Sequence, residues 1–262
     1  MRVRPLVSAF SFVFVVLCAA GAGAQTAPAT PAGPAPAGWG SATVRLGVNA
    51  GLQAGASGFT ENSTLQIYQE NAPLTVAYGT KSGLLFDGSL GVHVKGRFGL
   101  GVAMSYSRAT LAGQVHAGIP NPFVFGVLRP VDGTASGLRR TEIGTHLQAL
   151  YLLPMNRRVD LMLSGGPSIL YVQQDLVTNV NFSQTYPYDT ATFQSATLTR
   201  VKKSAVGFNV GVDLSWRLTR RIGVGAMVRY TRATVSLPVT GQPSISAHAG
   251  GFQAGAGLRL MF

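Results

Sequence analysis

The stretch FGLGVAMSYS, residues 98–107, alternates large apolar side chains with glycine, alanine and serine. A period of two places each class on its own face of a β-strand. The preceding stretch, LLFDGSLGVHVK at 84–95, alternates in the same way and puts Asp87, His93 and Lys95 on the face of small and polar residues. A short Lys-Gly-Arg segment joins the two, so together they predict a tight antiparallel hairpin.

The same alternation recurs after Ser41 and predicts eight strands. They are expected at about 42–53, 83–95, 97–111, 138–153, 158–174, 200–217, 221–236 and 246–262. Short connections at 95–97, 154–158 and 218–221 alternate with long ones at about 54–82, 112–137 and 175–199, and the last, about 237–245, is intermediate. An even number of antiparallel strands, joined by alternating short turns and long loops, is typical of transmembrane β-barrels.

The polarity of the two strand faces separates a membrane barrel from a soluble one. Eight strands enclose a space just wide enough for side chains to fill. The small and charged residues of one face fit that space, whereas the Leu, Phe, Trp and Tyr residues of the other would overfill it. We therefore expect the large apolar face to point outward into lipid, where a closed barrel satisfies every backbone hydrogen bond.

Composition excludes several other classes. Of 262 residues, 46% are hydrophobic and only 11% are charged, against about 25% charged in an average soluble domain. Disordered chains combine low hydrophobicity with many charges, so this composition excludes disorder over most of the length. A single cysteine excludes a disulfide or cysteine-metal scaffold. The low fraction of charged residues disfavours an ordinary cytosolic enzyme. A membrane-spanning helix needs about 20 apolar residues, which only the N-terminus approaches.

The N-terminus has the features of a secretory signal peptide. Arg2 and Arg4 precede an apolar run at 6–20, and Ala-Gly-Ala at 22–24 supplies a cleavage site, so cleavage is expected after Ala24. The alternative is an uncleaved membrane anchor. Cys18 follows Leu17, which does not fit a lipoprotein site, and cleavage would remove it. Residues 25–40 are predicted to be an Ala/Pro-rich leader, and residues 41–262 the barrel.

Aromatic residues on the predicted outward face gather near the strand ends. Phe98, Tyr151, Trp216 and Phe262 lie beside the short turns. On the long-loop side the corresponding residues are Phe86, Tyr106, Tyr171 and Tyr230. Such girdles mark the two interfaces of transmembrane barrels.

The chain closes with GGFQAGAGLRLMF, residues 250–262, in which Leu258, Leu260 and Phe262 share the outward face. This strand resembles the terminal strand of bacterial outer-membrane proteins, which commonly ends in Phe and is recognised by the barrel-assembly machinery. With the eight-strand pattern, residues 41–262 resemble the small outer-membrane barrels of the OmpA/OmpX-like group.

The resemblance implies an all-β, eight-stranded antiparallel up-and-down transmembrane barrel in the bacterial outer membrane. It implies the barrel-assembly machinery as a partner, with Leu258, Leu260 and Phe262 as its signal. The group includes adhesins, stabilisers and narrow channels, so the resemblance is specific for architecture rather than activity.

Charged and histidine residues on the small-residue face are expected in the lumen. They are Arg45, Asp87, His93, Lys95, Arg140, Glu142, His146, Asp160, Asp213, Arg229 and Arg259. Buried charges need partners, which predicts a network of salt bridges that plugs the barrel. The alternative is a gated, narrow path for small solutes lined by the same pairs.

A second group of basic residues lies near the long-loop ends of the predicted strands, at positions whose side chains face outward. It consists of Arg108, Arg139, Arg200, Lys202 and Arg232. Because arginine binds phosphate well, we predict contacts with the phosphates or core sugars of lipopolysaccharide, the alternative being a solvated rim. Outer-membrane lipid is thus an expected partner and nucleic acid is not.

No residue pattern predicts a catalytic site, a cofactor site or a metal site. Lipid A deacylases, also eight-stranded barrels, carry His and Ser two residues apart on a lipid-facing strand. Here no histidine is followed two residues later by serine, and Ser246 stands before His248 in the wrong order. We therefore predict a monomeric, non-enzymatic protein with a structural and surface-interaction role, whose long loops are presented to an extracellular ligand. The aromatics at 181–189 either form part of that binding surface or pack the loop against its neighbours, and packing is the favoured interpretation. A narrow channel is the main alternative, and a lipid-modifying enzyme the weaker one.

Overall fold

The computed structural model describes residues 43–54, 58–79, 81–239 and 242–262. The predicted signal peptide at 1–24 and leader at 25–40 lie outside these ranges. The described residues form an all-β structure. No helix among them is long and apolar enough to cross a membrane.

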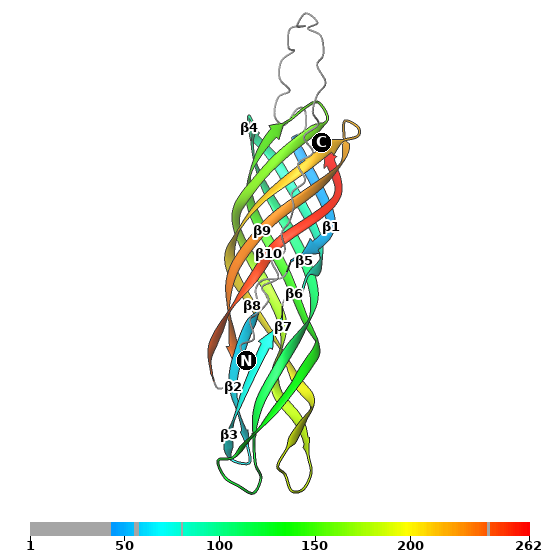
Figure 1. The fold of residues 1–262 in the computed structure, drawn as a ribbon. Helices are drawn as coiled ribbons and strands as arrows, with labels where there is room; N and C mark the ends of the chain where they lie inside the picture. The colour runs from blue at the N-terminus through cyan, green and yellow to red at the C-terminus, as the bar shows by residue number, and fades with distance from the viewer. Residues whose placement is uncertain (1–42, 55–57, 80, 240–241) are drawn as a thin grey trace, which may run out of the picture. The chain divides into compact units, whose positions relative to one another are not determined.

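Eight of the strands close into a ring (Figure 1). In ring order they are β1 (Val44–Gln53), β4 (Gly83–Lys95), β5 (Phe98–Pro120), β6 (Leu128–Pro154), β7 (Val159–Gln184), β8 (Ala191–Arg217), β9 (Ile222–Val239) and β10 (Gln242–Met261). All neighbours are antiparallel, and β1 closes the ring by pairing with both β4 and β10. The predicted eight-stranded up-and-down barrel is confirmed.

The bulky apolar side chains point out of the barrel, as the alternation predicted. Leu100 is 62% exposed and Val210 53%, whereas Asp87 on the opposite face is 5% exposed. Aromatic rings border this outer belt: Phe98 lies against Tyr151 beside the short turns, and Tyr230 against Phe252 toward the other end. A continuous belt of exposed apolar side chains around a closed barrel is the surface that hydrocarbon solvates, so the belt marks the membrane-spanning part.

A hairpin lies in the 54–82 stretch, where the sequence predicted a loop. Its strands are β2 (Phe59–Ile67) and β3 (Glu70–Tyr78). Their two-residue turn, Tyr68-Gln69, has positive φ at both positions, which such turns usually achieve with Asn or Gly. The usual hairpin signal is therefore missing from the sequence. β3 pairs with β5 at 113–117, beyond the end of β4.

The long loops are also shorter than predicted, because β5 to β8 continue past the belt. The connections β5–β6 and β7–β8 occupy only 121–127 and 185–190. Figure 1 shows these extensions with β2 and β3 toward its lower end.

The extensions enclose an apolar core of their own. Beyond the belt, toward the long loops, the inward positions change from small and charged residues to large apolar ones such as Leu111, Val115, Ile119 and Leu138. Side chains from β3, β5, β6 and β7 pack together there and exclude water. We call this cluster the outer core; it lies at the loop end of the barrel, beyond the apolar belt.

Candidate functional site

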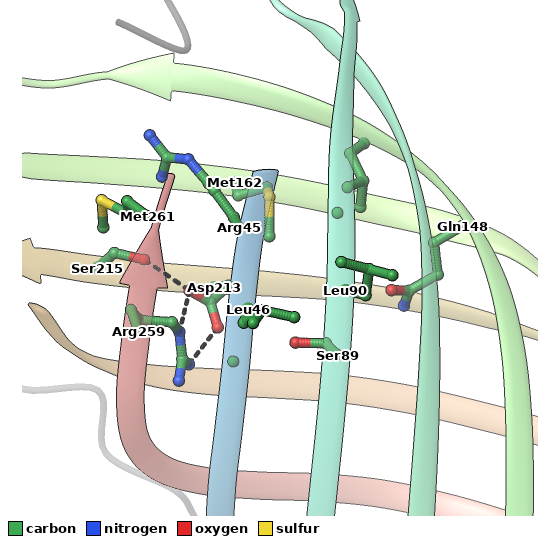
Figure 2. Close-up of a pocket in the computed structure, with 13 residues that line it drawn as sticks. Arg45, Leu46, Ser89, Leu90, Gln148, Met162, Asp213, Ser215, Arg259 and Met261 are labelled. Atoms are coloured by element: carbon green, nitrogen blue, oxygen red, sulfur yellow. Dashed lines mark hydrogen bonds and ion pairs between the residues drawn. The ribbon is translucent and has the colours of Figure 1, made fainter. Parts of the chain in front are cut away.

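The lumen of the membrane-spanning part holds a connected set of hydrogen-bonded side chains. Asp213 of β8 accepts hydrogen bonds from Ser215 Oγ (2.8 Å) and from Arg259 Nε (3.0 Å) (Figure 2). Arg259 Nη1 donates to Asn49 Oδ1 at 2.7 Å, and Asn49 Nδ2 donates to Asp87 Oδ1 at 3.1 Å. The set therefore crosses the lumen from β8 to β4.

The same set continues toward the loop end through Arg229, which forms an ion pair with Asp87. Arg229 Nε donates to Gln253 Oε1, and Gln253 Nε2 donates to Gln53 Oε1, both at 2.8 Å. Gln53 Nε2 donates in turn to Glu142 Oε2 at 2.8 Å. Arg140 Nε completes the series by donating to the other oxygen of Glu142 at 2.6 Å.

A separate cluster lies toward the short turns. Asp160 accepts from Arg45 Nη2 at 3.1 Å and from Arg217 Nη2 at 3.4 Å. Each predicted lumen carboxylate (Asp87, Glu142, Asp160 and Asp213) thus has at least one arginine partner. We call the two clusters together the lumen network.

Little space remains inside the network. Two cavities among these side chains have volumes of about 30 Å³ each, one lined by Arg45, Asp213 and Arg259 and the other by Asp87, Asp213 and Arg229. A volume of this size holds about one or two water molecules. At these two places the described side chains leave room for only about one or two water molecules.

Three predicted lumen residues are placed differently from the rest. Lys95 is exposed, so its predicted inward position is wrong; a register shift between His93 and Lys95 interrupts the alternation at the strand end. His93 is half-buried, and its Nε2 lies 3.1 Å from the Gly96 carbonyl oxygen in the adjacent turn.

His146 is fully buried in the lumen, but its partners are hydroxyl groups rather than charges. Its Nε2 lies 3.0 Å from Ser105 Oγ and its Nδ1 2.8 Å from Ser168 Oγ. A serine beside a histidine is an arrangement used in nucleophilic catalysis. Here both ring nitrogens are occupied and the side chain is 0% exposed, so the trio joins β5, β6 and β7 across the wall.

Sequence reasoning missed the neutral members of the network. Asn49, Gln53 and Gln253 carry hydrogen bonds between the charged residues, and Gln174 accepts one from Arg140. All four occupy strand positions whose side chains face inward, as those of the charged residues do. The available signal was amide side chains at these inward positions, because a buried amide links an acceptor to a donor.

Three of the five predicted lipopolysaccharide contacts share one pocket on the outer surface. Arg108, Arg139 and Arg200 line a pocket of about 180 Å³ together with Thr141 and Gln173. In the strand registers, Arg108 lies opposite Thr141, and Thr141 opposite Gln173. We call this site the arginine pocket.

Asp175 organises the arginine pocket. Its carboxylate accepts from Arg200 Nε at 2.8 Å and from the backbone amide of Arg139 at 3.0 Å. Burial raises the pKa of Asp175, but the hydrogen bonds and charges of Arg200 and Arg139 outweigh this effect, so the pKa is lowered overall. The hydrogen bond from Arg200 to Asp175 raises the pKa of the guanidinium in return.

The other two predicted contacts are exposed but do not line the pocket. Lys202 lies opposite Gln173 on β8, the strand that also carries Arg200. Arg232 lies on β9 opposite Phe208. The five basic residues therefore do not form one continuous site.

The three residues of the predicted assembly signal lie on the outer face of the last strand. Leu258, Leu260 and Phe262 are exposed. The Phe262 carbonyl accepts hydrogen bonds from the amides of Thr43 and Val44, at 2.6 and 3.0 Å, which fixes the chain end to β1.

The tips of the outer hairpins are tied together by Arg129, which is 3% exposed. Its guanidinium donates to the carbonyl of Pro120 at 2.6 Å, to the side chain of Gln184 at 2.7 Å and to the carbonyl of Tyr188 at 3.0 Å. Around this tie, aromatic side chains are open to solvent: Phe125 is 85% exposed and Tyr186 is 84%. The tips thus present apolar rings on a cross-linked base.

Comparisons with known proteins extend only to the fold. No protein-family model matches the sequence, and no curated protein matches it. The chain resembles small outer-membrane β-barrels among the solved structures. It is 14% identical to Neisserial surface protein A (NspA), with a TM-score of 0.43, over 84% of this chain and 96% of that chain.

Two other solved structures give similar values. Outer membrane protein OprG from Pseudomonas aeruginosa is 12% identical, with a TM-score of 0.44, over 84% of this chain and 96% of that chain. Outer membrane protease OmpT from Escherichia coli is 11% identical, with a TM-score of 0.46, over 84% of this chain and 97% of that chain.

Proposed function

We propose that this protein is a closed outer-membrane barrel with a structural and surface-interaction role, delivered through a cleaved signal peptide. The observation that carries the proposal is the filled lumen. The lumen network occupies the membrane-spanning part, and the outer core closes the loop end. A barrel that is full of paired side chains contributes stability and surface rather than a path for solutes.

Charge balance supports closure over conduction. A path too narrow for a hydrated ion needs groups that replace the ion's water, but the lumen carboxylates already bind arginine. Removing one partner of such a pair would strand the other in the interior. The network is therefore expected to stay paired.

The outer hairpins are the surface that the protein presents. Arg129 cross-links their tips, and exposed rings such as Phe125 and Tyr186 surround it. Aromatic residues are enriched at protein interfaces, because they bury a large area with few rotatable bonds. We expect an extracellular ligand to bind at these tips.

The lipid environment supplies the remaining partners. We expect the rim arginines to contact lipopolysaccharide in the outer leaflet. We expect the barrel-assembly machinery to recognise the last strand through Leu258, Leu260 and Phe262, and the mature protein to be a monomer.

Single-channel recording in planar bilayers tests closure. Refolded protein whose heat-modifiable gel migration reports a closed barrel is expected to give no stable unitary current. A water-filled porin recorded under the same conditions is the positive control. A stable unitary current from the unaltered protein would overturn the proposal in favour of a narrow channel.

A further inference from the structure

We propose that the arginine pocket binds one phosphate group of a lipopolysaccharide molecule, and that an apolar groove below it takes the end of an acyl chain of the same molecule. The inference rests on the proposed outer-membrane location. It narrows the predicted set of five basic contacts to the three that the fold brings together.

The pocket lies at the level where lipid phosphates are found. Arg108 comes two residues after Tyr106 on β5, and Gln173 two residues after Tyr171 on β7. Two residues span about 7 Å along a strand. The pocket therefore begins just beyond the aromatic residues that border the apolar belt on the loop side.

The charge of the pocket suits a phosphate monoester. Asp175 binds Arg200 and the Arg139 amide, so it neutralises one of the three guanidinium charges and leaves two for a ligand. A phosphate monoester carries a charge of about −1.5 to −2 at neutral pH. Thr141 and Gln173 add neutral hydrogen-bonding groups to the pocket wall.

The groove below arises where the β6–β7 ladder is interrupted. His146 pairs with Ser168 and Ala149 with Gly165, but no pair joins the residues between them. Pro167 has no amide hydrogen to donate there. Over this interruption lies a groove of about 590 Å³, lined by apolar side chains that include Leu100, Val102 and Leu147.

The separation of pocket and groove matches a lipid of the outer leaflet. Thr141 of the pocket and Leu147 of the groove are six residues apart on β6, a distance of about 20 Å along the strand. A strand tilt of about 40° reduces this to about 15 Å along the membrane normal. Leu147 lies opposite Val102, about 10 Å from Tyr106 along the membrane normal, so the upper end of the groove lies near the midplane, where the acyl chains of the outer leaflet end.

This geometry favours a lipid over a free phosphate ion. The pocket alone would accept either, but only a phosphorylated lipid also places an acyl chain over β5, β6 and β7. Guanidinium groups also replace the divalent cations that otherwise neutralise neighbouring phosphates. Lipid held by the pocket is therefore expected to resist removal by a chelator.

Retention of lipopolysaccharide during purification tests the phosphate part. Protein is extracted in mild detergent with EDTA, and bound lipopolysaccharide is quantified by its phosphate and sugar content. Wild-type protein is expected to keep a stoichiometric amount. Combined Arg108→Gln and Arg139→Gln is expected to lose most of it, because each charged contact changes affinity about tenfold.

A matched control carries the same charge change elsewhere. Combined Lys202→Gln and Arg232→Gln removes two exposed positive charges that do not line the pocket, and it is expected to retain lipopolysaccharide. Equal loss from both pairs would overturn the pocket in favour of a diffuse basic rim. Equal retention by both would overturn it as well. Heat-modifiable migration confirms that each variant is folded.

Binding of defined probes separates the sources of phosphate. Refolded wild-type protein is expected to bind diphosphoryl lipid A more tightly than its dephosphorylated form, with inorganic phosphate a weak competitor. Equal binding of both lipid forms, or inorganic phosphate binding as tightly as lipid A, would contradict the proposal.

Ala149→Phe tests the groove, because Ala149 is exposed and lines it. Filling the groove is expected to weaken lipid A binding several-fold and to leave the weak competition by inorganic phosphate unchanged. Unchanged lipid A affinity would refute the acyl-chain part. Conductance is measured independently of lipid binding. A protein that conducts but still binds lipid A would overturn the closed barrel alone, and a closed barrel that does not bind lipid A would overturn the lipid site alone.

Discussion

A charge placed in the middle of the apolar belt probes the membrane assignment directly. Val102 is 42% exposed and lies four residues from both Phe98 and Tyr106, the aromatic residues that border the belt on β5. Four residues span about 13 Å along the strand, or about 10 Å along the membrane normal at a tilt of about 40°. Val102 therefore sits close to the bilayer midplane.

We expect Val102→Arg to reduce the free energy of unfolding by about 2–4 kcal/mol, the cost of an arginine on the lipid face at midplane depth. Val94→Arg is the matched control. Val94 is 61% exposed next to the turn at 95–97, so its side chain lies near the interface. The same substitution there should cost only about 0–1 kcal/mol.

Urea-induced unfolding from lipid vesicles, followed by tryptophan fluorescence, measures both values. Trp216 lies on the exposed outer face and should report the loss of the apolar environment. In water, exposed positions tolerate substitution within about 0.5 kcal/mol. If both variants stay within that range, or if both cost the same, the belt does not face hydrocarbon and the reasoning fails.

Three further predictions concern the interior and the outer hairpins. Arg229→Gln should cost about 3–5 kcal/mol by stranding buried Asp87, and adding Asp87→Asn should recover part of this loss in a double-mutant unfolding cycle; additive costs would contradict the pairing. Burial raises the pKa of Glu61 above 4.5, and the hydrogen bond from Tyr78 only partly offsets this. The folded hairpin thus holds a proton that the unfolded one releases, so its stability should fall as pH rises from 4.5 through the raised pKa. Hydrogen exchange of β2 and β3 should show this dependence of stability on pH in the wild type, and Glu61→Gln should abolish it. Arg129→Gln should speed exchange at 121–127 and 185–190 with little change in barrel unfolding, and unaltered exchange there would show that Arg129 does not hold the tips.

The sequence predicted the barrel well because its main signal is local. Alternation within FGLGVAMSYS fixes which face each side chain takes, whatever the strand partners are. The decision that bulky residues face outward needed only the width of an eight-stranded interior. Lys95 is the exception, since a register shift at the end of β4 breaks the alternation there.

The structure beyond the belt was less predictable. The alternation along a strand does not say whether an inward position meets a narrow lumen or an apolar core. Val115 and Ile119 were therefore predicted to lie in a loop, although they form part of the outer core. The β2–β3 hairpin escaped notice because its turn at Tyr68-Gln69 lacks the usual Asn or Gly. Its pairing with β5 depends on where β4 begins, because β3 takes the place beside β5 that β4 leaves free before Gly83.

The sequence by itself determined the eight strands of the ring, the orientation of their faces and the kinds of residue inside the membrane-spanning part and at its rim, because these follow from spacing along one strand. Only the tertiary structure decided which side chains meet. Asp87 finds Arg229 from 142 positions away, and Arg108, Arg139 and Arg200 share a pocket while Arg232 does not. Those contacts depend on the register between strands, which arises when the whole ring closes.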